Sequence, residues 1–261
     1  NGLHAAHAKL AADFGIHVLT EKPISTDLKS SIEMLKKCRE KKVNLFVVLP
    51  LRYYKLTKYL KKCLIDRRFG KLHLINLNVF WTRPQLYFEE SAWRGTERLD
   101  GGILLNQTIH YFDLFYHLFG MPSAVHTFNQ TFRKIETEDT SVINLNWDGN
   151  FLGSLAITML TYPKNLEDSL TIIGEKGTVK IKNISKAEIE IWDFQEKQNY
   201  DQTITQTVLN DKDGHESVYE ETCKIISNNK LSYVIAEEAL NSLELVLAAK
   251  NSHLEKKIIT I

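Results

Sequence analysis

The stretch IHVLTEKPISTDLKSSIEMLKKCREKKVNLFVVL, residues 16–49, decides the fold class. It begins and ends with short apolar runs, residues 16–20 and 43–49, which are typical of buried strands. Between them, residues 26–41 carry apolar side chains at helical spacing behind a Ser-Thr-Asp cap. A strand, a helix and a second strand in this order predict a βαβ unit, whose two strands lie parallel in one sheet.

The chain after Pro50 follows a different pattern. Long stretches alternate apolar and polar residues with the period of a strand, and the turns Asp148-Gly149 and Gly174–Gly177 favour hairpins. This pattern predicts a large open antiparallel sheet with helices on one face. The expected strands are residues 71–81, 123–132, 138–147, 151–160, 169–174, 177–182 and 187–193; the expected helices are residues 4–14, 55–66, 216–228 and 234–250, and residues 195–214 are expected to form a surface loop.

Composition and charge narrow the possible functions. Of the 261 residues, 43% are hydrophobic and 25% are charged, which is typical of a globular protein. The 33 Lys and Arg balance 32 Asp and Glu, so net charge gives no support for a nucleic-acid or membrane partner. No apolar run reaches the roughly 18 residues of a membrane span. Cys38, Cys63 and Cys223 follow no metal or disulfide pattern, which favours a reduced, cytoplasmic protein without a bound metal.

Residues 101–119, GGILLNQTIHYFDLFYHLF, are the most informative segment for function. We expect one helix that is apolar nearly all round and hence buried. Its polar residues recur at helical spacing within an arc of roughly 60°: Asn106, His110, Asp113 and His117. Such a stripe faces either a ligand cleft or a hydrogen-bonded network in the core, because unpaired buried polar groups cost roughly 1–3 kcal/mol each. The two glycines at its start favour the cleft, since they let a ligand come close.

A second candidate is Glu21-Lys22-Pro23, directly after the first expected strand. Open α/β sheets bind their ligands at the carboxyl ends of parallel strands, and a lysine there can act as an acid, a base or a hydrogen-bond donor. The alternative for Lys22 is an ordinary surface lysine in a strand–helix turn.

These motifs together resemble the Gfo/Idh/MocA oxidoreductase family. The resemblance covers almost the whole chain, and within the family the sequence is similar to the bacterial UDP-N-acetylglucosaminuronate 3-dehydrogenases. It rests on Glu21-Lys22-Pro23, on Gly101-Gly102 followed by Asn106, His110 and Asp113, and on the stretches 79–85 (VFWTRPQ), 93–96 (WRGT), 159–167 (MLTYPKNLE) and 173–179 (IGEKGTV).

The family's fold is α/β plus α+β, so the resemblance implies two domains. Residues 1–50 would be the C-terminal part of an NAD(P)-binding Rossmann domain. Residues 51–261 would form an α/β domain for substrate binding and oligomerisation, with the helix at 234–250 packing back on the Rossmann part. The sequence contains no G-x-G-x-x-G turn, so we expect the N-terminal part of the Rossmann domain to be missing from this chain.

For function, the resemblance implies NAD-dependent oxidation of the 3-hydroxyl of a UDP-N-acetylglucosaminuronate-type sugar, in the synthesis of O antigen and other surface polysaccharide. His110 is the expected general base and Lys22 orients the hydroxyl oxygen, although these roles could be exchanged. Asn106 stands where the family pattern carries Asp, which leaves His110 with one anionic partner fewer. A homodimer or homotetramer is expected.

A uronate substrate requires a cation, preferably a planar guanidinium, and two arginines are candidates. For each of them a surface salt bridge is the alternative. The expected substrate-binding residues are Arg83, Gln85, Tyr87, Arg94, Tyr162 and Asn165, and the expected cofactor-binding residues are Asn1, His4, Glu21 and Lys22. Two other functions fit the same residues: a cyclitol or free-sugar dehydrogenase, or a non-catalytic protein that binds sugar nucleotides.

Overall fold

A computed structural model describes residues 1–209 and 214–261 of the chain. Its N-terminal part is a βαβ unit, in which β1 (Val18–Thr20) and β2 (Leu45–Val47) pair in parallel. Helix α1 (His4–Asp13) precedes the unit and α2 (Leu28–Glu40) connects its strands. The side chain of Asp27 accepts a hydrogen bond from the first turn of α2, as expected of a cap. The predicted parallel sheet is therefore confirmed.

The second part of the chain forms an eight-stranded sheet in the order β10-β4-β5-β6-β3-β7-β8-β9. Neighbouring strands are antiparallel except β3 and β6, which pair in parallel. The predicted large, mainly antiparallel sheet is confirmed. Its strands are β3 (Leu72–Phe80), β4 (Ala124–Gln130), β5 (Thr140–Asn146), β6 (Leu152–Thr158), β7 (Glu167–Gly174), β8 (Gly177–Asn183), β9 (Glu188–Phe194) and β10 (Ile259–Thr260).

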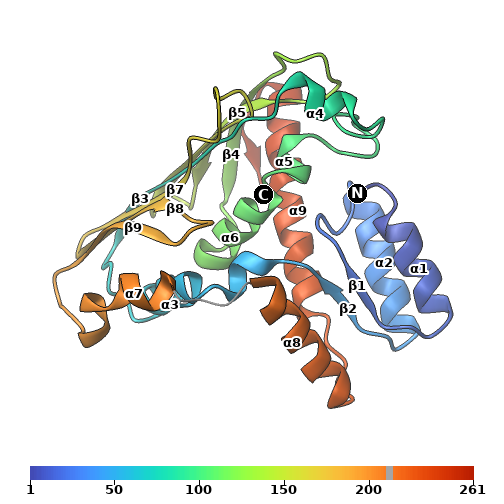
Figure 1. Cartoon of the computed structure of the whole chain (residues 1–261), viewed down its shortest axis with the longest axis horizontal. Coiled ribbons are helices and arrows are strands. Elements are labelled where there is room, and N and C mark those ends of the chain that lie inside the picture. The colour runs from blue at the N-terminus through green and yellow to red at the C-terminus, as the bar shows by residue number, and fades with distance from the viewer. Residues whose placement is uncertain (210–213) are drawn as a thin grey trace.

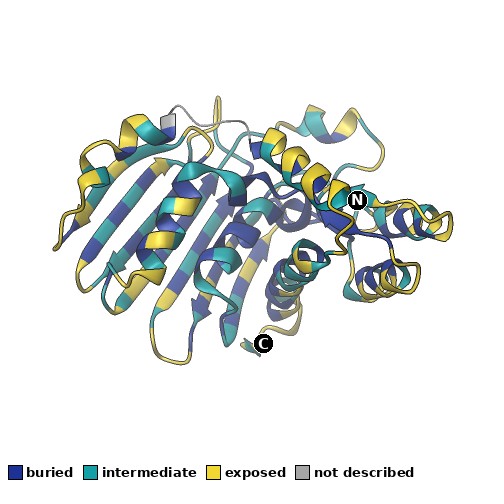
Figure 2. Cartoon of the chain, turned by 90° about the horizontal axis from the view of Figure 1, so that it is seen from below, coloured by how far each residue is buried: buried dark blue, intermediate teal, exposed yellow. Residues whose placement is uncertain are grey.

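One face of this sheet forms the core, because its strands alternate buried and more exposed residues (Figure 2). Helix α6 (Ile109–Phe119) covers this face, and its fully buried Phe115 packs against Trp147 with ring centroids 5.8 Å apart. Helix α9 (Val234–Glu255) contacts β4 and α6 on one side and α2 and β2 on the other. Figure 1 shows α9 lying between the N-terminal unit and the large sheet. Helix α9 therefore packs against both parts of the chain.

The remaining helices connect these elements. They are η1 (Pro50–Tyr53), α3 (Lys55–Ile65), α4 (Gln85–Glu89), α5 (Ile103–Asn106), η2 (Asn199–Gln202), α7 (Ile204–Leu209) and α8 (Gly214–Ser227). All three cysteines are free, and none of the helices among the described residues is long and apolar enough to cross a bilayer.

The prediction of one helix over residues 101–119 was wrong, because the segment forms two helices, α5 and α6, with a turn between them. The Thr108 hydroxyl bonds to the carbonyl oxygens of Ile103 and Leu104, at 3.1 and 3.4 Å. The Thr108 amide also donates to the Ile103 carbonyl, one residue further back than in an α-helix. A hydroxyl that bonds locally to the backbone competes with the helical pattern, and this competition accounts for the turn.

The predicted loop over residues 195–214 was also wrong for most of its length, since η2 and α7 lie within it. A buried ion pair between Arg68 and Asp201, at 2.7 Å, ties η2 to the segment that follows α3. Ile204 and Val208 are buried one helical turn apart on α7. Tertiary contacts therefore order a segment whose polar composition indicated a loop, and residues 210–213 of the predicted loop lie outside the described residues.

Candidate active site

Lys22 lies just beyond the carboxyl end of β1. Its Nζ donates a hydrogen bond to the backbone carbonyl oxygen of Asn106, at 2.7 Å. The His4 imidazole Nδ1 donates to the carbonyl of Pro23, at 2.7 Å, and holds the same turn from α1. Burial lowers the pKa of Lys22, while the nearby carboxylates of Glu21 and Asp100 oppose that shift. Lys22 is thus an anchored, half-buried amine that contacts the turn between α5 and α6.

Asn106 is the last residue of α5 and is buried. Its side-chain amide donates to the carboxylate of Asp100, just before the glycine pair, and its backbone carbonyl holds Lys22. The structure therefore brings Lys22 and Asn106 together although 84 residues separate them in sequence.

His110 lies in the first turn of α6, four residues after Asn106. Its Nδ1 is buried and has no hydrogen-bond partner in the described part of the chain. Burial, together with the charge of Lys22 and the nearby His215 of α8, lowers the pKa of His110 to about 3. The imidazole is consequently neutral at physiological pH, and in the tautomer protonated on Nε2 its unpartnered Nδ1 can accept a proton.

Arg83 is held in a row of alternating aromatic rings and guanidinium groups. Its guanidinium lies 5.2 Å from the centroid of the Trp81 ring and 5.4 Å from that of Tyr87. Arg94 lies on Tyr87 as well, at 4.2 Å, and 5.8 Å from Trp93. Cation–π contacts of this kind hold guanidinium groups in fixed planes, which suits them to bind a carboxylate or a phosphate.

Gln107 connects this row to the Lys22 contact. Its amide oxygen accepts from Arg83 Nε at 3.2 Å, and its amide nitrogen donates to the hydroxyl of Tyr87 at 2.8 Å. Because Gln107 directly follows Asn106, a single turn of the chain joins Lys22, Asn106 and Arg83. Gln107 was not among the predicted site residues, although it stood within the most informative segment.

The other predicted substrate-binding residues do not all lie beside the arginine row. Gln85 bonds through both amide atoms to the backbone of Lys134, at 3.3 and 3.0 Å. Asn165 accepts a hydrogen bond from the Thr82 amide at 2.9 Å, next to Arg83. Tyr162 is 94% exposed. Asn165 therefore borders the arginine row, whereas Gln85 is committed to a neighbouring loop and Tyr162 points outward.

The predicted cofactor-binding residues gather around the Lys22 turn. The Asn1 side chain donates to the Asp100 carbonyl at 2.7 Å, and His4 holds the turn as described above. Glu21 is exposed, and its carboxylate accepts from the backbone amide of Lys22 at 3.3 Å.

The polar stripe predicted for one long helix is divided in the structure. Asn106 and His110 lie at the Lys22 contact, but Asp113 accepts hydrogen bonds from Arg52 Nε at 2.7 Å and from the Ser242 hydroxyl at 2.7 Å. Burial, with Arg52 and Lys61 nearby, lowers the pKa of His117 to about 4. Asp113 therefore belongs to a hydrogen-bonded network in the core. For Asn106 and His110 we keep the proposal that they face a ligand cleft.

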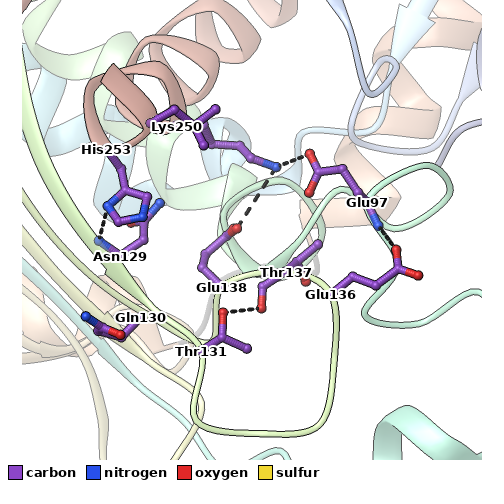
Figure 3. Close-up of a pocket in the computed structure, with 10 residues that line it drawn as sticks. Glu97, Asn129, Gln130, Thr131, Glu136, Thr137, Glu138, Lys250 and His253 are labelled. Atoms are coloured by element: carbon purple, nitrogen blue, oxygen red, sulfur yellow. Dashed lines mark hydrogen bonds and ion pairs between the residues drawn. The ribbon is translucent and has the colours of Figure 1, made fainter. Parts of the chain in front are cut away.

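A hollow of about 570 Å³ lies behind the glycine turn (Figure 3). Lys250 of α9 reaches into it and donates to Glu97 at 2.6 Å and to the Gly101 carbonyl at 3.0 Å. The buried carboxylate of Glu138 accepts from the first-turn amide of Leu104 at 3.1 Å. Gly102 has a φ of +89°, which other residues rarely adopt, and a Cβ there would lie 2.4 Å from that carboxylate, so the position favours glycine. These contacts of Lys250 and Glu138 hold in place the glycine turn that precedes Asn106.

A lysine at the end of a parallel strand bonds the last residue of α5, and the histidine-bearing α6 follows directly on the face of a large open sheet. This combination of parts is found in the oxidoreductase family whose two domains match the chain. Residues 1–49 match the domain described as "Oxidoreductase family, NAD-binding Rossmann fold", and residues 61–261 match "Oxidoreductase family, C-terminal alpha/beta domain". The chain belongs to this oxidoreductase family, the Gfo/Idh/MocA family.

Two solved structures are similar to this chain over its full length. The WlbA dehydrogenase from Bordetella pertussis, in complex with NADH and UDP-GlcNAcA, is 38% identical with a TM-score of 0.91. The WlbA dehydrogenase from Chromobacterium violaceum, with the same two ligands, is 37% identical with a TM-score of 0.93. The curated scyllo-inositol 2-dehydrogenase (NADP(+)) IolW of Bacillus subtilis is 23% identical over 278 residues. The chain spans 77%, 75% and 76% of these three proteins, respectively.

Proposed function

We propose that this protein oxidises the 3-hydroxyl of a UDP-N-acetylglucosaminuronate-type sugar nucleotide with NAD as the oxidant, in the synthesis of bacterial surface polysaccharide. One observation carries the proposal: Lys22 Nζ contacts the carbonyl of Asn106, one helical turn before a neutral His110 whose Nδ1 is unpartnered in the described residues. The similarity to the two WlbA dehydrogenases, whose structures hold NADH and UDP-GlcNAcA, supports the choice of cofactor and sugar.

The residues present fit the reacting end of a nicotinamide and an alcohol. Lys22 lies beyond the carboxyl end of a parallel strand, where sheets of this kind bind their ligands. His110, whose Nδ1 is unpartnered among the described residues, lies one helical turn after the Asn106 that Lys22 contacts. Asn1, His4 and Glu21 surround the same turn and would contact the ribose on the nicotinamide side. When it is bound, the nicotinamide ring supplies the acceptor for the hydride that leaves the sugar carbon.

The protein's own part in the reaction is to hold the hydroxyl and remove its proton. Lys22, which donates through its ammonium group, orients the hydroxyl oxygen and stabilises the negative charge that develops there. His110 accepts the hydroxyl proton on its free ring nitrogen. Asn106 hydrogen-bonds a neighbouring sugar hydroxyl. The exchanged assignment, with Lys22 as the base, remains open because burial also lowers the pKa of Lys22.

The arginine row is proposed to bind the uronate carboxylate. Gln107 and two aromatic rings fix the plane of Arg83, so the guanidinium is oriented before the substrate arrives. Tyr87 and Asn165 border the same place and are proposed to bind sugar hydroxyls. Arg94 is the second candidate, although its Nη1 already donates to the Tyr87 carbonyl at 2.8 Å and to Glu90 at 3.2 Å.

Replacing Arg83 with Gln should weaken binding of UDP-N-acetylglucosaminuronate roughly 10- to 100-fold, since hydrogen bonds to a charged group contribute about 1.5–3 kcal/mol. Binding of the uncharged UDP-N-acetylglucosamine should change little, because that sugar has no carboxylate. Isothermal titration calorimetry with both nucleotides measures the difference. Arg94→Gln is the matched variant: a selective loss there instead would move the carboxylate site to Arg94, and equal losses for both sugars would rule out a uronate site at Arg83.

The function itself is tested by incubating the protein, at its natural length, with NAD and one candidate substrate at a time. NADH formation with UDP-N-acetylglucosaminuronate, and not with myo-inositol or free glucose, is the expected result. Turnover of the cyclitol or free sugar alone would favour the other dehydrogenase hypothesis. Binding of the sugar nucleotide without any NADH would favour the non-catalytic protein.

The outer face of the large sheet supports a homo-oligomer. Phe128 and Val142 are paired across β4 and β5 and are 62% and 47% exposed. Leu74 and Leu152 form a second such pair across β3 and β6, at 40% and 56%. An exposed apolar face of this kind is typical of an interface, and we propose that two copies pack through it to form a dimer or a dimer of dimers.

Placing charges on this face should separate the copies, because lysines opposite each other in a symmetric interface repel and are costly to bury. We expect the Phe128→Lys/Val142→Lys variant to elute as a monomer with an unchanged circular dichroism spectrum. Light scattering at micromolar concentration measures the mass. A wild-type protein that is already monomeric would contradict the proposal.

A further inference from the structure

Asp100 carries a buried carboxylate beside the proposed active site, and the residue is only 3% exposed. One carboxylate oxygen accepts a hydrogen bond from the Asn106 amide, and the other accepts from the backbone amide of Gly95 at 2.9 Å. The backbone carbonyl of Asp100 accepts from the Asn1 side chain at 2.7 Å. Asp100 therefore contacts both chain segments that meet at the site, yet it follows no motif that marks it in the sequence.

The bond to Asp100 determines how the Asn106 amide is oriented. An ionised carboxylate can only accept hydrogen bonds, so the NH₂ group of Asn106 must face it. The amide oxygen is then turned away from Asp100, and it forms no hydrogen bond in the described part of the chain. Asn106 is thereby left with a free acceptor, while its backbone carbonyl is occupied by Lys22.

Asp100 also provides negative charge near the half-buried amine of Lys22. The charges that act on Lys22 are the carboxylates of Glu21 and Asp100, which raise its pKa against the effect of burial. The exposed Glu21 is screened by solvent, whereas Asp100 is not. Burial raises the pKa of Asp100 itself, and the Gly95 amide, the Asn106 amide and Lys22 act in the opposite direction.

We propose that Asp100 is a positioning residue of the active site, which turns the amide oxygen of Asn106 toward the substrate and keeps Lys22 in its ammonium form. This role rests on the proposed dehydrogenase function. In this proposal Asn106 binds the sugar hydroxyl, and Asp100 determines whether the oxygen or the nitrogen of the Asn106 amide faces that hydroxyl.

The test uses the Asp100→Asn variant of the natural-length protein, which removes the charge and keeps the shape. We expect kcat for the sugar nucleotide to fall about 10- to 100-fold through misorientation of the bound hydroxyl, with KM little changed. Competitive acetylation of the unliganded protein reports the titration of the Lys22 amine directly, and that titration should move to lower pH than in the wild type. The reciprocal Asp100→Asn/Asn106→Asp variant restores one carboxylate and one amide, and should return the Lys22 titration toward its original position.

Glu97→Gln is the matched control, since it removes a carboxylate three residues away that faces Lys250 instead of Lys22. It should leave the Lys22 titration unchanged. An Asp100→Asn protein that keeps both the wild-type titration and the wild-type kcat would overturn the proposal, as would a reciprocal variant that folds but shows no recovery. If Lys22 shifts as expected while the wild type oxidises no sugar nucleotide, the charge coupling stands and the proposed function fails.

Discussion

Replacing His110 with Ala is expected to lower kcat about 10²- to 10⁴-fold, which is the usual loss when a general base is removed. KM should change little, because the imidazole accepts the proton as the transition state forms and contributes little to ground-state binding. The free Nδ1 and the neutral state of the ring are the basis of this expectation. Steady-state kinetics with UDP-N-acetylglucosaminuronate and NAD, on the protein at its natural length, measures both constants.

His117 provides the matched control, because it lies on the same helix and its pKa is also lowered, to about 4. Its neighbours are Arg52 and Lys61 rather than Lys22, so His117→Ala should leave kcat nearly unchanged. A similar loss of kcat in both variants would show that His110 supports the fold and not the chemistry. An increase in KM alone for His110→Ala would mean that His110 binds the substrate and that Lys22 is the base.

The pH dependence provides a second measure of the same assignment. A base must be deprotonated to act, and a pKa of about 3 keeps His110 neutral as the pH falls below the ordinary histidine value of about 6.5. The acidic limb of kcat/KM should therefore lie well below pH 6.5. In the Lys22→Met variant one cause of the lowered pKa is removed, so the His110 titration followed by nitrogen-15 NMR should move to higher pH.

Replacing Arg52 with Met is expected to destabilise the protein by about 3–5 kcal/mol, because it leaves a buried charge without its partner. The Arg52 and Asp113 side chains are 5% and 1% exposed, and two guanidinium nitrogens bond the carboxylate at 2.7 and 2.5 Å. Glu238 of α9 forms an ion pair with the third nitrogen. The network thus joins η1, α6 and α9, and its loss should appear as a lower denaturant midpoint in urea.

The Arg52→Met/Asp113→Leu double variant distinguishes the cost of an orphaned charge from the value of the ion pair. Replacing both partners with apolar side chains removes the uncompensated charge, so most of the lost stability should return. A loss below about 1 kcal/mol for Arg52→Met would indicate instead that Asp113 is reached by water or pairs elsewhere, at odds with its burial. A double variant as unstable as the single one would assign the effect to packing.

The sequence by itself determined most of the elements and their class, because periodicity and turn chemistry are local properties. The strands between residues 71 and 193 were predicted from alternation alone, and Asp148-Gly149 forms its turn with positive φ at both residues. The parallel pairing of β1 and β2 was predicted from the strand–helix–strand order, because the rules for chain connections leave few other arrangements of such a unit. Asn106 and His110 were selected from their helical spacing, and Lys22 from its position after the first expected strand; the family resemblance pointed to the same three residues.

Only the tertiary structure decided which polar groups became partners. Asp113 shared a helical spacing with His110, but its partner Arg52 comes from 61 residues away, so the sequence pattern could not separate a core pair from a site residue. Asp100 and Gln107 acquired their roles through contacts with side chains that spacing does not reveal. The break between α5 and α6 depended on one threonine hydroxyl that bonds to the backbone behind it. The physical reason is the same in each case: the period of an element determines which face a side chain lies on, whereas its partner is determined by what the rest of the chain packs against that face.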